Sequence, residues 1–281
     1  MKYLITGISG TLGQAVSKIL LDKKDTQIIG YSRDEQKQRL LPKNPKVTLY
    51  LGDVRDRDRI TEASRGVDIL FHFAALKCVD TLEDNPDEAK KTNVDGTENV
   101  LHAQRVNGIK RVVLSSTDKA VYPVNAYGAS KMLSEYLVRR NQNNVVVRYG
   151  NVLASRGSVV GEFVRTIRND KTVKITHSEM TRFFLTQEEA AQFVVASAFA
   201  GQGGLYIPDI KCTSIVTLAR TIGKILNTKV IPQNVGIRPG EKLHECLRTL
   251  EEGGPIYSNT GTKFTETELL DKLTPIVASF A

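Results

Sequence analysis

The sequence predicts a doubly wound α/β fold, in which helices cover both faces of a parallel sheet. In the first half of the chain, short β-branched runs alternate with amphipathic stretches at the spacing of strand–helix–strand units. Several runs, such as Val145-Val146-Val147, are apolar throughout, as strands buried on both faces are. A glycine-rich segment directly follows the first run, where such folds bind ligands.

Taken in order, the runs predict strands at 3–6, 27–31, 47–51, 69–73, 111–115 and 145–148. Between them we expect helices at about 11–22, 34–41, 56–65, 86–107 and 126–142. After residue 150 the alternation fades: a Gly-, Ser- and Arg-rich stretch precedes helices near 187–200 and 213–227 and a polar tail. We therefore expect a first domain over 1–150 and a smaller region over 151–281 that packs on it and receives some crossover segments.

The composition is that of a soluble globular protein, with 41% hydrophobic and 25% charged residues among 281. No apolar run is long enough to span a membrane, and the N-terminus leaves no room for a signal peptide. The three cysteines have no CxxC spacing, so we expect a reducing cytoplasm. The four histidines show no ligand spacing, so no metal site is expected.

The net charge of +8 favours an anionic partner. The basic residues are dispersed and interleaved with acids, as in the run from Arg55 to Arg59, which argues against nucleic acid and membrane surfaces. A phosphorylated small molecule remains.

The glycine-rich segment reads G-x-x-G-x-x-G between the first strand and the first helix. Its glycines would allow a tight turn, a close approach of backbone N–H groups to a pyrophosphate, and helix–strand packing. Three glycines alone also fit a plain loop before a helix, but their position in a strand–helix–strand unit favours dinucleotide binding. The expected contacts are Gly7, Ser9, Gly10, Thr11, Leu12 and Gly13.

The end of the second strand indicates the cofactor. NAD-specific sites place an acidic residue there, whereas Ser32 and Arg33 suit the 2′-phosphate of NADP. The alternatives are that Arg33 is a solvated charge and that Asp34 or Glu35 takes the acidic role. Further cofactor contacts are expected after the third and fourth strands, at Asp53, Val54, Ala74 and Ala75.

A catalytic group is predicted after the fifth strand. Tyr127 and Lys131 are spaced i, i+4 on one helix face, where an ammonium would lower the tyrosine pKa and make a usable base. Both would also contact the cofactor. Tyr-x-x-x-Lys alone occurs by chance, but here it follows a strand that ends in Ser115-Ser116-Thr117.

Several segments together carry a family resemblance: 116–120, 125–131, 148–152, 155–160, 180–183 and 238–245. The chain resembles the extended short-chain dehydrogenase/reductases, and more narrowly the inverting UDP-N-acetylglucosamine 4,6-dehydratases that open the pseudaminic acid pathway. The likeness runs from residue 1 to beyond 245. Thr117-Asp118-Lys119 separates the chain from dTDP- and GDP-sugar dehydratases, which have an acidic residue where Lys119 stands.

The resemblance implies a reaction sequence. Hydride passes from C4 of the sugar to NADP⁺ while Tyr127, supported by Lys131, takes the 4-hydroxyl proton and Thr117 binds that oxygen. Lys119 removes the C5 proton, Asp118 protonates the leaving hydroxyl at C6, and hydride returns to C6. Reprotonation of C5 on the other face inverts the configuration.

The resemblance also implies a substrate site and a homo-oligomer. Arg182 and Arg238 would bind the UDP diphosphate, since guanidinium groups suit phosphate, and Glu241 the uridine ribose. Single arginines are more often surface charges, and a loop lysine or a capping asparagine explains Lys77 and Asn93 nearly as well. The expected substrate contacts are Lys77, Asn151, Arg156, Ser158, Arg182, Arg238 and Glu241.

The chain departs from the family pattern at Gly161, where the family has proline, and it is somewhat shorter than bacterial members. Tyr127 favours the pseudaminic branch, because capsule-synthesis cousins carry methionine there. Two alternatives stay open: a nucleotide-sugar 4-epimerase, which would have no use for the Asp118–Lys119 pair, and a non-catalytic NADP-binding sensor. The choice of UDP-N-acetylglucosamine over UDP-glucose rests on the likeness.

Overall fold

The computed structural model describes residues 1–155 and 157–280 and divides the chain into two compact units. The first contains Met1–Arg148 and Glu188–Pro208, and the second contains Tyr149–Gln187 and Asp209–Ala281. The chain thus leaves the first unit after its sixth strand, returns for one helix and one strand, and leaves again.

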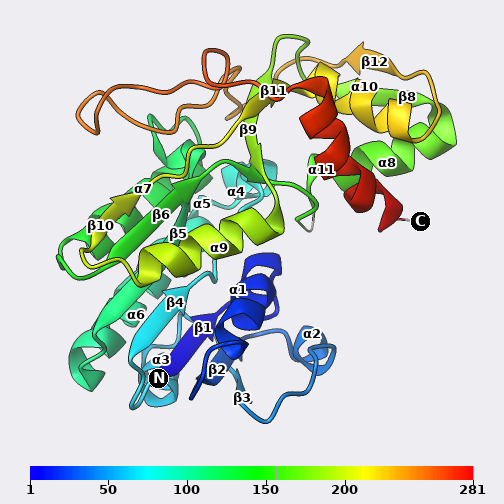
Figure 1. The fold of residues 1–281 in the computed structure, drawn as a ribbon. Helices are drawn as coiled ribbons and strands as arrows, with labels where there is room; N and C mark the ends of the chain where they lie inside the picture. Colours follow the sequence, from blue (N-terminus) through cyan, green and yellow to red (C-terminus); the bar gives the residue numbers. More distant parts are fainter. Residues whose placement is uncertain (156, 281) are drawn as a thin grey trace. The chain divides into compact units, whose positions relative to one another are not determined.

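The first unit is built on a seven-stranded sheet in the order β10-β6-β5-β4-β1-β2-β3 (Figure 1). The strand pairs described for it are parallel, so the doubly wound fold is confirmed. The strand order reverses between β1 and β4, which is where such sheets bind ligands. The strands are β1 Lys2–Thr6, β2 Gln27–Ser32, β3 Val47–Leu51, β4 Ile69–His72, β5 Arg111–Thr117, β6 Val145–Tyr149 and β10 Gly204–Tyr206.

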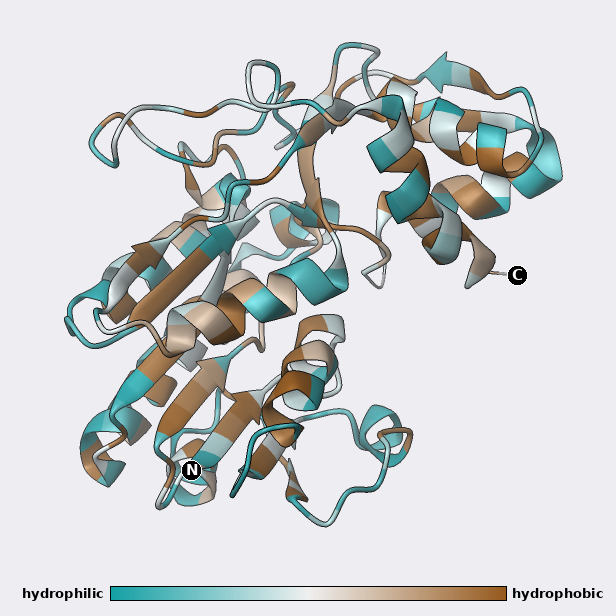
Figure 2. Cartoon of the chain, viewed as in Figure 1, coloured by the Kyte–Doolittle hydropathy of each residue, from teal (hydrophilic) through white to brown (hydrophobic). Residues whose placement is uncertain are grey.

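Both faces of the inner strands of this sheet are buried, whereas the edge strand β3 is largely exposed. Leu4, Leu70 and Val112 belong to a core cluster with residues of the helices α3 and α6. On the other face, the ring of Tyr3 lies 6.1 Å from that of Phe71 and 6.3 Å from that of Phe199, just beyond α9. The inner strands are accordingly the most hydrophobic part of this unit (Figure 2). The helices are α1 Thr11–Leu21, α2 Glu35–Arg39, α3 Arg57–Ala63, α4 Val79–Asp84, α5 Pro86–Ala89, α6 Gly96–Asn107, α7 Ala126–Arg139 and α9 Gln187–Ala198.

The expectation of a single helix over 86–107 is wrong, because the helix is interrupted near its middle. A π-helical turn, η1 (Lys90–Asp95), separates α5 from α6. It carries the buried Asn93, whose side chain accepts from Leu76 N at 2.8 Å and donates to Leu76 O at 3.0 Å. Because these bonds clamp the loop after β4, tertiary contacts account for the changed helix register here.

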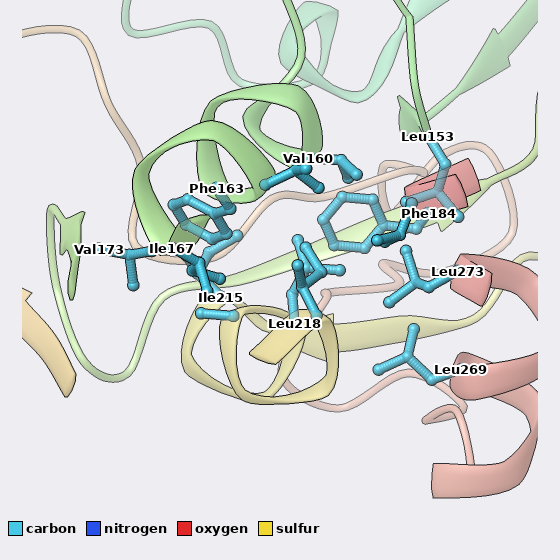
Figure 3. Packing of buried hydrophobic residues seen from close by; sticks show 14 of the residues in the cluster. Leu153, Val160, Phe163, Ile167, Val173, Phe184, Ile215, Leu218, Leu269 and Leu273 are labelled. Carbon is cyan, nitrogen blue, oxygen red and sulfur yellow. The ribbon is translucent and has the colours of Figure 1, made fainter. Parts of the chain in front are cut away.

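The second unit packs helices against two small sheets. One sheet has the order β11-β9-β7 and the other pairs β12 with β8. Figure 3 shows its core, where Phe163 and Ile167 of one helix meet Ile215 and Leu218 of another. The elements are β7 Asn151–Val152, α8 Val159–Asp170, β8 Thr172–Ile175, β9 Thr181–Leu185, β11 Cys212–Ser214, α10 Ile215–Ile225, β12 Ile231–Asn234 and α11 Glu266–Ala278.

The expectation of a polar tail at the C-terminus is also wrong. This segment contains α11, which begins with a capping box between Thr265 and Glu268. Leu269, Leu273 and Val277, spaced every four residues, lie in the core. Helix α8 was likewise missed, because the Gly- and Ser-rich stretch before it hides its apolar stripe.

In the part of the chain that the structure describes, no helix is both long and apolar enough to cross a membrane. Among the same residues, no group of three or more His, Cys, Asp or Glu side chains is placed to hold a metal ion.

Candidate active site

The predicted site residues of the first unit gather at one edge of its sheet. Parallel strands end at the same edge, so the segments that follow β1, β2, β3, β4 and β5 lie next to each other there. The glycine-rich loop, Arg33, Asp53, Ala74 and Thr117 each belong to one of these segments.

The glycine-rich loop forms a cradle at the start of α1. Gly7 has a positive φ of 71°, its N–H donates to Tyr31 O at 2.8 Å, and Gly10 N–H donates to Gly7 O at 2.8 Å. A Cβ on Gly13 would collide with the carbonyl oxygen of Gly7, so no larger residue fits where the helix crosses the loop. The helix begins at Thr11 and directs its first N–H groups toward this loop, which fits a pyrophosphate.

Arg33 follows β2 with about half of its side chain exposed, and its guanidinium lies 3.5 Å from the Asp53 carboxylate. Arg55 holds the same carboxylate through Nε at 3.0 Å and Nη2 at 2.7 Å. Burial works against the charge of Asp53, but these bonds outweigh it and lower its pKa. Two guanidinium groups therefore meet beside the end of β2.

The two acids that could have replaced Arg33 in cofactor selection are engaged elsewhere. Asp34 accepts from Lys37 N as the N-cap of α2, and Glu35 pairs with Arg39 at 2.9 Å. The Ser32 hydroxyl accepts a 2.9 Å hydrogen bond from the buried Gln38 side chain. This arrangement favours a phosphate over a ribose hydroxyl at the end of β2.

The loop after β4 is fixed to the end of β1. The Thr6 hydroxyl accepts from Phe73 N and Ala74 N, both at 3.1 Å. It also bonds the buried His72 at 2.8 Å. Ala74 and Ala75 are half-buried and Val54 is buried, so small apolar surfaces line this part of the edge.

Thr117, Asp118 and Lys119 lie where the fifth strand ends and the next turn begins. Strand β5 ends at Thr117, and a 3₁₀ turn, η2 (Asp118–Ala120), follows. The Thr117 hydroxyl donates to Asp118 Oδ1 at 3.0 Å, and Lys119 Nζ pairs with the same oxygen at 3.1 Å. Asp118 is fully buried, whereas the Lys119 side chain remains 17% exposed. A buried acid and a more accessible amine are thus held in contact.

Helix α7 brings Tyr127 to this turn. Asn125 caps the helix by accepting from Gly128 N at 2.6 Å, so Tyr127 lies in the first turn. A Cβ on Gly128 would collide with the carbonyl oxygen of Lys119, so only glycine lets the helix lie this close to η2. Lys131 lies one turn further along and is 3% exposed.

The expected lowering of the Tyr127 pKa is wrong for the chain without cofactor. Burial raises this pKa to about 12, and the charge of Lys119 and a hydrogen bond with Thr117 only partly oppose it. Lys119, rather than Lys131, is the cation that stabilises the phenolate. Burial also lowers the pKa of Lys131 to about 8.

A buried network that the sequence motifs do not predict lies beneath these groups. Ser116 Oγ donates to Glu135 Oε1 at 2.5 Å, and Arg148 holds the same carboxylate through Nε at 3.0 Å and Nη2 at 2.5 Å. A signal was present: Arg148 is a charge inside the apolar run of β6, and buried charges need partners.

Within the second unit, Arg182 is bound to the chain itself. Its guanidinium donates to the carbonyl oxygens of Thr181 at 2.7 Å, Lys242 at 2.9 Å and Leu243 at 3.2 Å, and lies 3.8 Å from Glu245. The side chain is 8% exposed. Arg182 therefore fastens the segment 242–245 to β9, and its contact with a diphosphate stays a prediction.

The other predicted substrate residues are more accessible. Arg238 is exposed, and its N–H donates to Glu241 at 3.2 Å. Asn151 is half-buried in β7, and Lys77 is exposed in the loop after β4. Ser158 is the N-cap of α8 and lines a pocket with Gly157, Gly161, Glu162, Arg165 and Phe280. Arg156 lies outside the described residues.

The sheet order, the glycine-rich loop and the Tyr-x-x-x-Lys helix define the chain as an enzyme of the short-chain dehydrogenase/reductase class. Solved sugar-nucleotide dehydratases and epimerases share the fold at low identity. Residues 3–260 match the family described as polysaccharide biosynthesis protein, and the chain belongs to this family.

Relatives carry two different names. A protein of Rickettsia bellii named UDP-glucose 4-epimerase is 42% identical over 89% of this chain and 78% of its own length. A Campylobacter jejuni protein named UDP-N-acetylglucosamine 4,6-dehydratase (inverting) is 41% identical over 90% of this chain and 79% of its own. The solved structure of Pen from Bacillus thuringiensis superposes with a TM-score of 0.91 at 29% identity, covering 98% of this chain and 97% of that one.

Proposed function

We propose that this chain is an NADP-dependent dehydratase that converts UDP-N-acetylglucosamine into the 4-keto-6-deoxy sugar with inversion at C5. The observation that carries the proposal is the Asp118–Lys119 ion pair, held at 3.1 Å beside Tyr127. An elimination needs an acid and a base at neighbouring carbons, and this pair supplies both. The relative from Campylobacter supports the substrate.

The glycine-rich loop and the segments after β2, β3 and β4 would hold the cofactor. The start of α1 fits its pyrophosphate, and Arg33 and Ser32 would bind the 2′-phosphate that distinguishes NADP from NAD. When bound, the nicotinamide supplies a reversible acceptor for hydride from C4 of the sugar.

The chain's own residues move the protons. Tyr127 takes the 4-hydroxyl proton in its phenolate form, which the charge of Lys119 and the hydrogen bond with Thr117 stabilise against burial. Thr117 also orients the sugar oxygen. A proton shared between Lys119 and Asp118 can leave the amine neutral and the acid protonated, which is the state that elimination needs. Lys119 then removes the C5 proton, made acidic by the 4-ketone, and Asp118 protonates the departing 6-hydroxyl. The proton gained by Tyr127 balances the proton that leaves with water. The C5 proton passes from Lys119 to solvent, and a solvent proton added to the opposite face of C5 replaces it and inverts the configuration.

The second unit would bind the UDP moiety. We assign the diphosphate to Arg238 and Arg182 and the uridine ribose to Glu241. Arg182 would contribute mainly by fixing the segment that follows Arg238. Lys77, Asn151, Arg156 and Ser158 complete the proposed substrate contacts. A homo-oligomer in the cytoplasm stays a prediction.

A 4-epimerase is the second candidate, favoured by the name of the Rickettsia relative. It would use Tyr127 and Lys131 in the same way but has no step for an adjacent acid and base. The two reactions give products of different mass, because only the dehydratase loses water.

The test is to incubate the purified protein with UDP-N-acetylglucosamine, and separately with UDP-glucose, and to analyse the products by chromatography and mass spectrometry. We expect the loss of one water from UDP-N-acetylglucosamine. A new peak of unchanged mass would show an epimerase. No reaction with either sugar, in protein shown to bind NADP, would contradict both candidates and favour a sensor.

A further inference from the structure

We propose that Glu135 is a positioning residue of this site: with Arg148 it fixes the end of β5 and provides the negative charge that Lys131 faces. This inference rests on the proposed function for its role in catalysis. Its geometry is independent of the substrate. Neither Glu135 nor Arg148 takes part in the proposed proton transfers.

The network joins three elements at one point. Glu135 comes from α7, Arg148 from β6 and Ser116 from β5, and their exposed fractions are 3%, 3% and 4%. The carboxylate uses both oxygens: Oε1 accepts from Ser116 at 2.5 Å and from Arg148 Nε at 3.0 Å, and Oε2 accepts from Arg148 Nη2 at 2.5 Å. Its orientation is therefore fixed by three bonds.

These bonds fix the backbone next to the proposed catalytic residues. Ser116 immediately precedes Thr117, so the bond from its hydroxyl fixes the strand end from which Thr117 and Asp118 project. Lys131 precedes Glu135 by four residues on α7, which places the two side chains on one helix face. A single carboxylate thus contacts the strand end and faces the catalytic lysine.

Stability alone does not account for this arrangement. Burying an ion pair costs desolvation energy that well-packed apolar side chains of similar volume would avoid. Replacing a buried ion pair by apolar groups is often neutral or stabilising, so stability is a weak reason for these charges.

The role that we infer for the Glu135 charge is to keep Lys131 protonated, and the other charges around Lys131 support it. Burial lowers the pKa of Lys131 to about 8, and Glu135 opposes the change. From β4, His72 also faces Lys131, but burial lowers the pKa of His72 to about 3 and leaves it neutral. From β6, Arg148 is paired with Glu135, but of the two it is Glu135 that acts on the pKa of Lys131 and raises it. Asp118 and Lys119 of η2 act on Tyr127. Without Glu135, Lys131 would lose its proton closer to neutral pH.

The test is a pH titration of Lys131 by NMR in full-length protein with isotope-labelled lysine, which needs no substrate. The signal is assigned by its loss in Lys131→Met. We expect Glu135→Gln to lower the titration midpoint by about one pH unit. Glu98→Gln, the same change at an exposed site on α6, should leave the midpoint where it is in the wild type. An unchanged midpoint in Glu135→Gln would overturn the proposal.

The double variant Glu135→Gln/Arg148→Met separates charge from folding, because it leaves no buried arginine unpaired. We expect it to melt at a higher temperature than Glu135→Gln while the Lys131 midpoint stays below that of the wild type. A midpoint that returns to the wild-type value together with the melting temperature would show a structural role only and overturn the proposal.

In turnover with UDP-N-acetylglucosamine, the alkaline limb of kcat should move to lower pH in Glu135→Gln, with KM changing less than twofold. An unmoved limb would overturn the catalytic role of Glu135. If the wild type does not turn over this sugar, the proposed function fails, and the NMR titration still decides the proposal for Lys131.

Discussion

Residue by residue, the site depends on polar groups that constrain each other's charge. Tyr127 is a weak acid in the chain without cofactor, because burial raises its pKa to about 12. Lys119 supplies the opposing positive charge and also forms the ion pair with Asp118. In the proposed reaction, the same amine therefore affects both the first proton transfer and the elimination.

Lys119→Met tests this assignment. Removing a general base costs roughly 10²- to 10⁴-fold in rate, so we expect water loss to fall by that factor. Oxidation at C4 should still proceed, but more slowly, because Tyr127 also loses the positive charge of Lys119. Reduced nicotinamide should then accumulate, visible as its near-ultraviolet absorbance. Lys110→Met is the matched control, because Lys110 is an exposed lysine just before β5. A dehydration rate equal to that of the wild type in Lys119→Met would remove Lys119 as the base.

Arg33→Ala tests the cofactor. A charge-assisted bond to a phosphate is worth about 1.5–3 kcal/mol when well formed, and Arg33 is half exposed, so we expect a loss of roughly tenfold in NADP affinity. NAD affinity should change little, since NAD lacks the 2′-phosphate. Calorimetric titration with both nucleotides measures the ratio. Equal losses for NADP and NAD would mean that Arg33 does not select the cofactor.

At the scale of elements, the site is set by how closely α7 approaches η2. The helix begins at a capped residue, Asn125, and its third residue, Gly128, lies against the carbonyl of Lys119. This contact determines the separation of Tyr127 from the Thr117–Lys119 turn. The absence of a side chain at Gly128 thus sets the distance of Tyr127, the proposed base, from Thr117 and Lys119.

Gly128→Ala should therefore displace the helix and lower kcat. A displacement on the order of 1 Å can cost about 10²-fold. The KM for the nucleotide sugar should change much less, because the predicted diphosphate contacts lie in the second unit. Ala129→Ser, at the exposed neighbouring position, is the control and should keep the kcat of the wild type. A Gly128→Ala protein with undiminished kcat would show that the contact does not position Tyr127.

At the scale of the whole molecule, the two halves of the chain differ in how far the sequence predicts them. Strands β1 to β6 of the first unit were predicted to within two residues at each end, because a parallel sheet buried on both faces needs apolar runs such as Val145–Val147. The short edge strand β10 was not predicted. The glycine-rich loop and Tyr127–Lys131 were predicted because their spacing is local.

The second unit was predicted poorly, for a physical reason. Its β11-β9-β7 sheet joins segments far apart in sequence, and its strands are too short to show a period. Helix α11 was within reach, since the capping box at Thr265 and the spacing of Leu269, Leu273 and Val277 are local signals. The charge of Arg148 inside the apolar run of β6 indicates a buried partner, but only the fold identifies that partner as Glu135.

The central claim is that Lys119 and Asp118 catalyse an elimination that begins with loss of the C5 proton. The most direct measurement is mass spectrometry and NMR of the product formed from UDP-N-acetylglucosamine in D₂O. The account predicts a product that has lost one water and carries one deuterium, located at C5 with inverted configuration. A dehydrated product with no deuterium at C5 would contradict it. So would an isomer of the substrate that has lost no water and gained no deuterium on carbon.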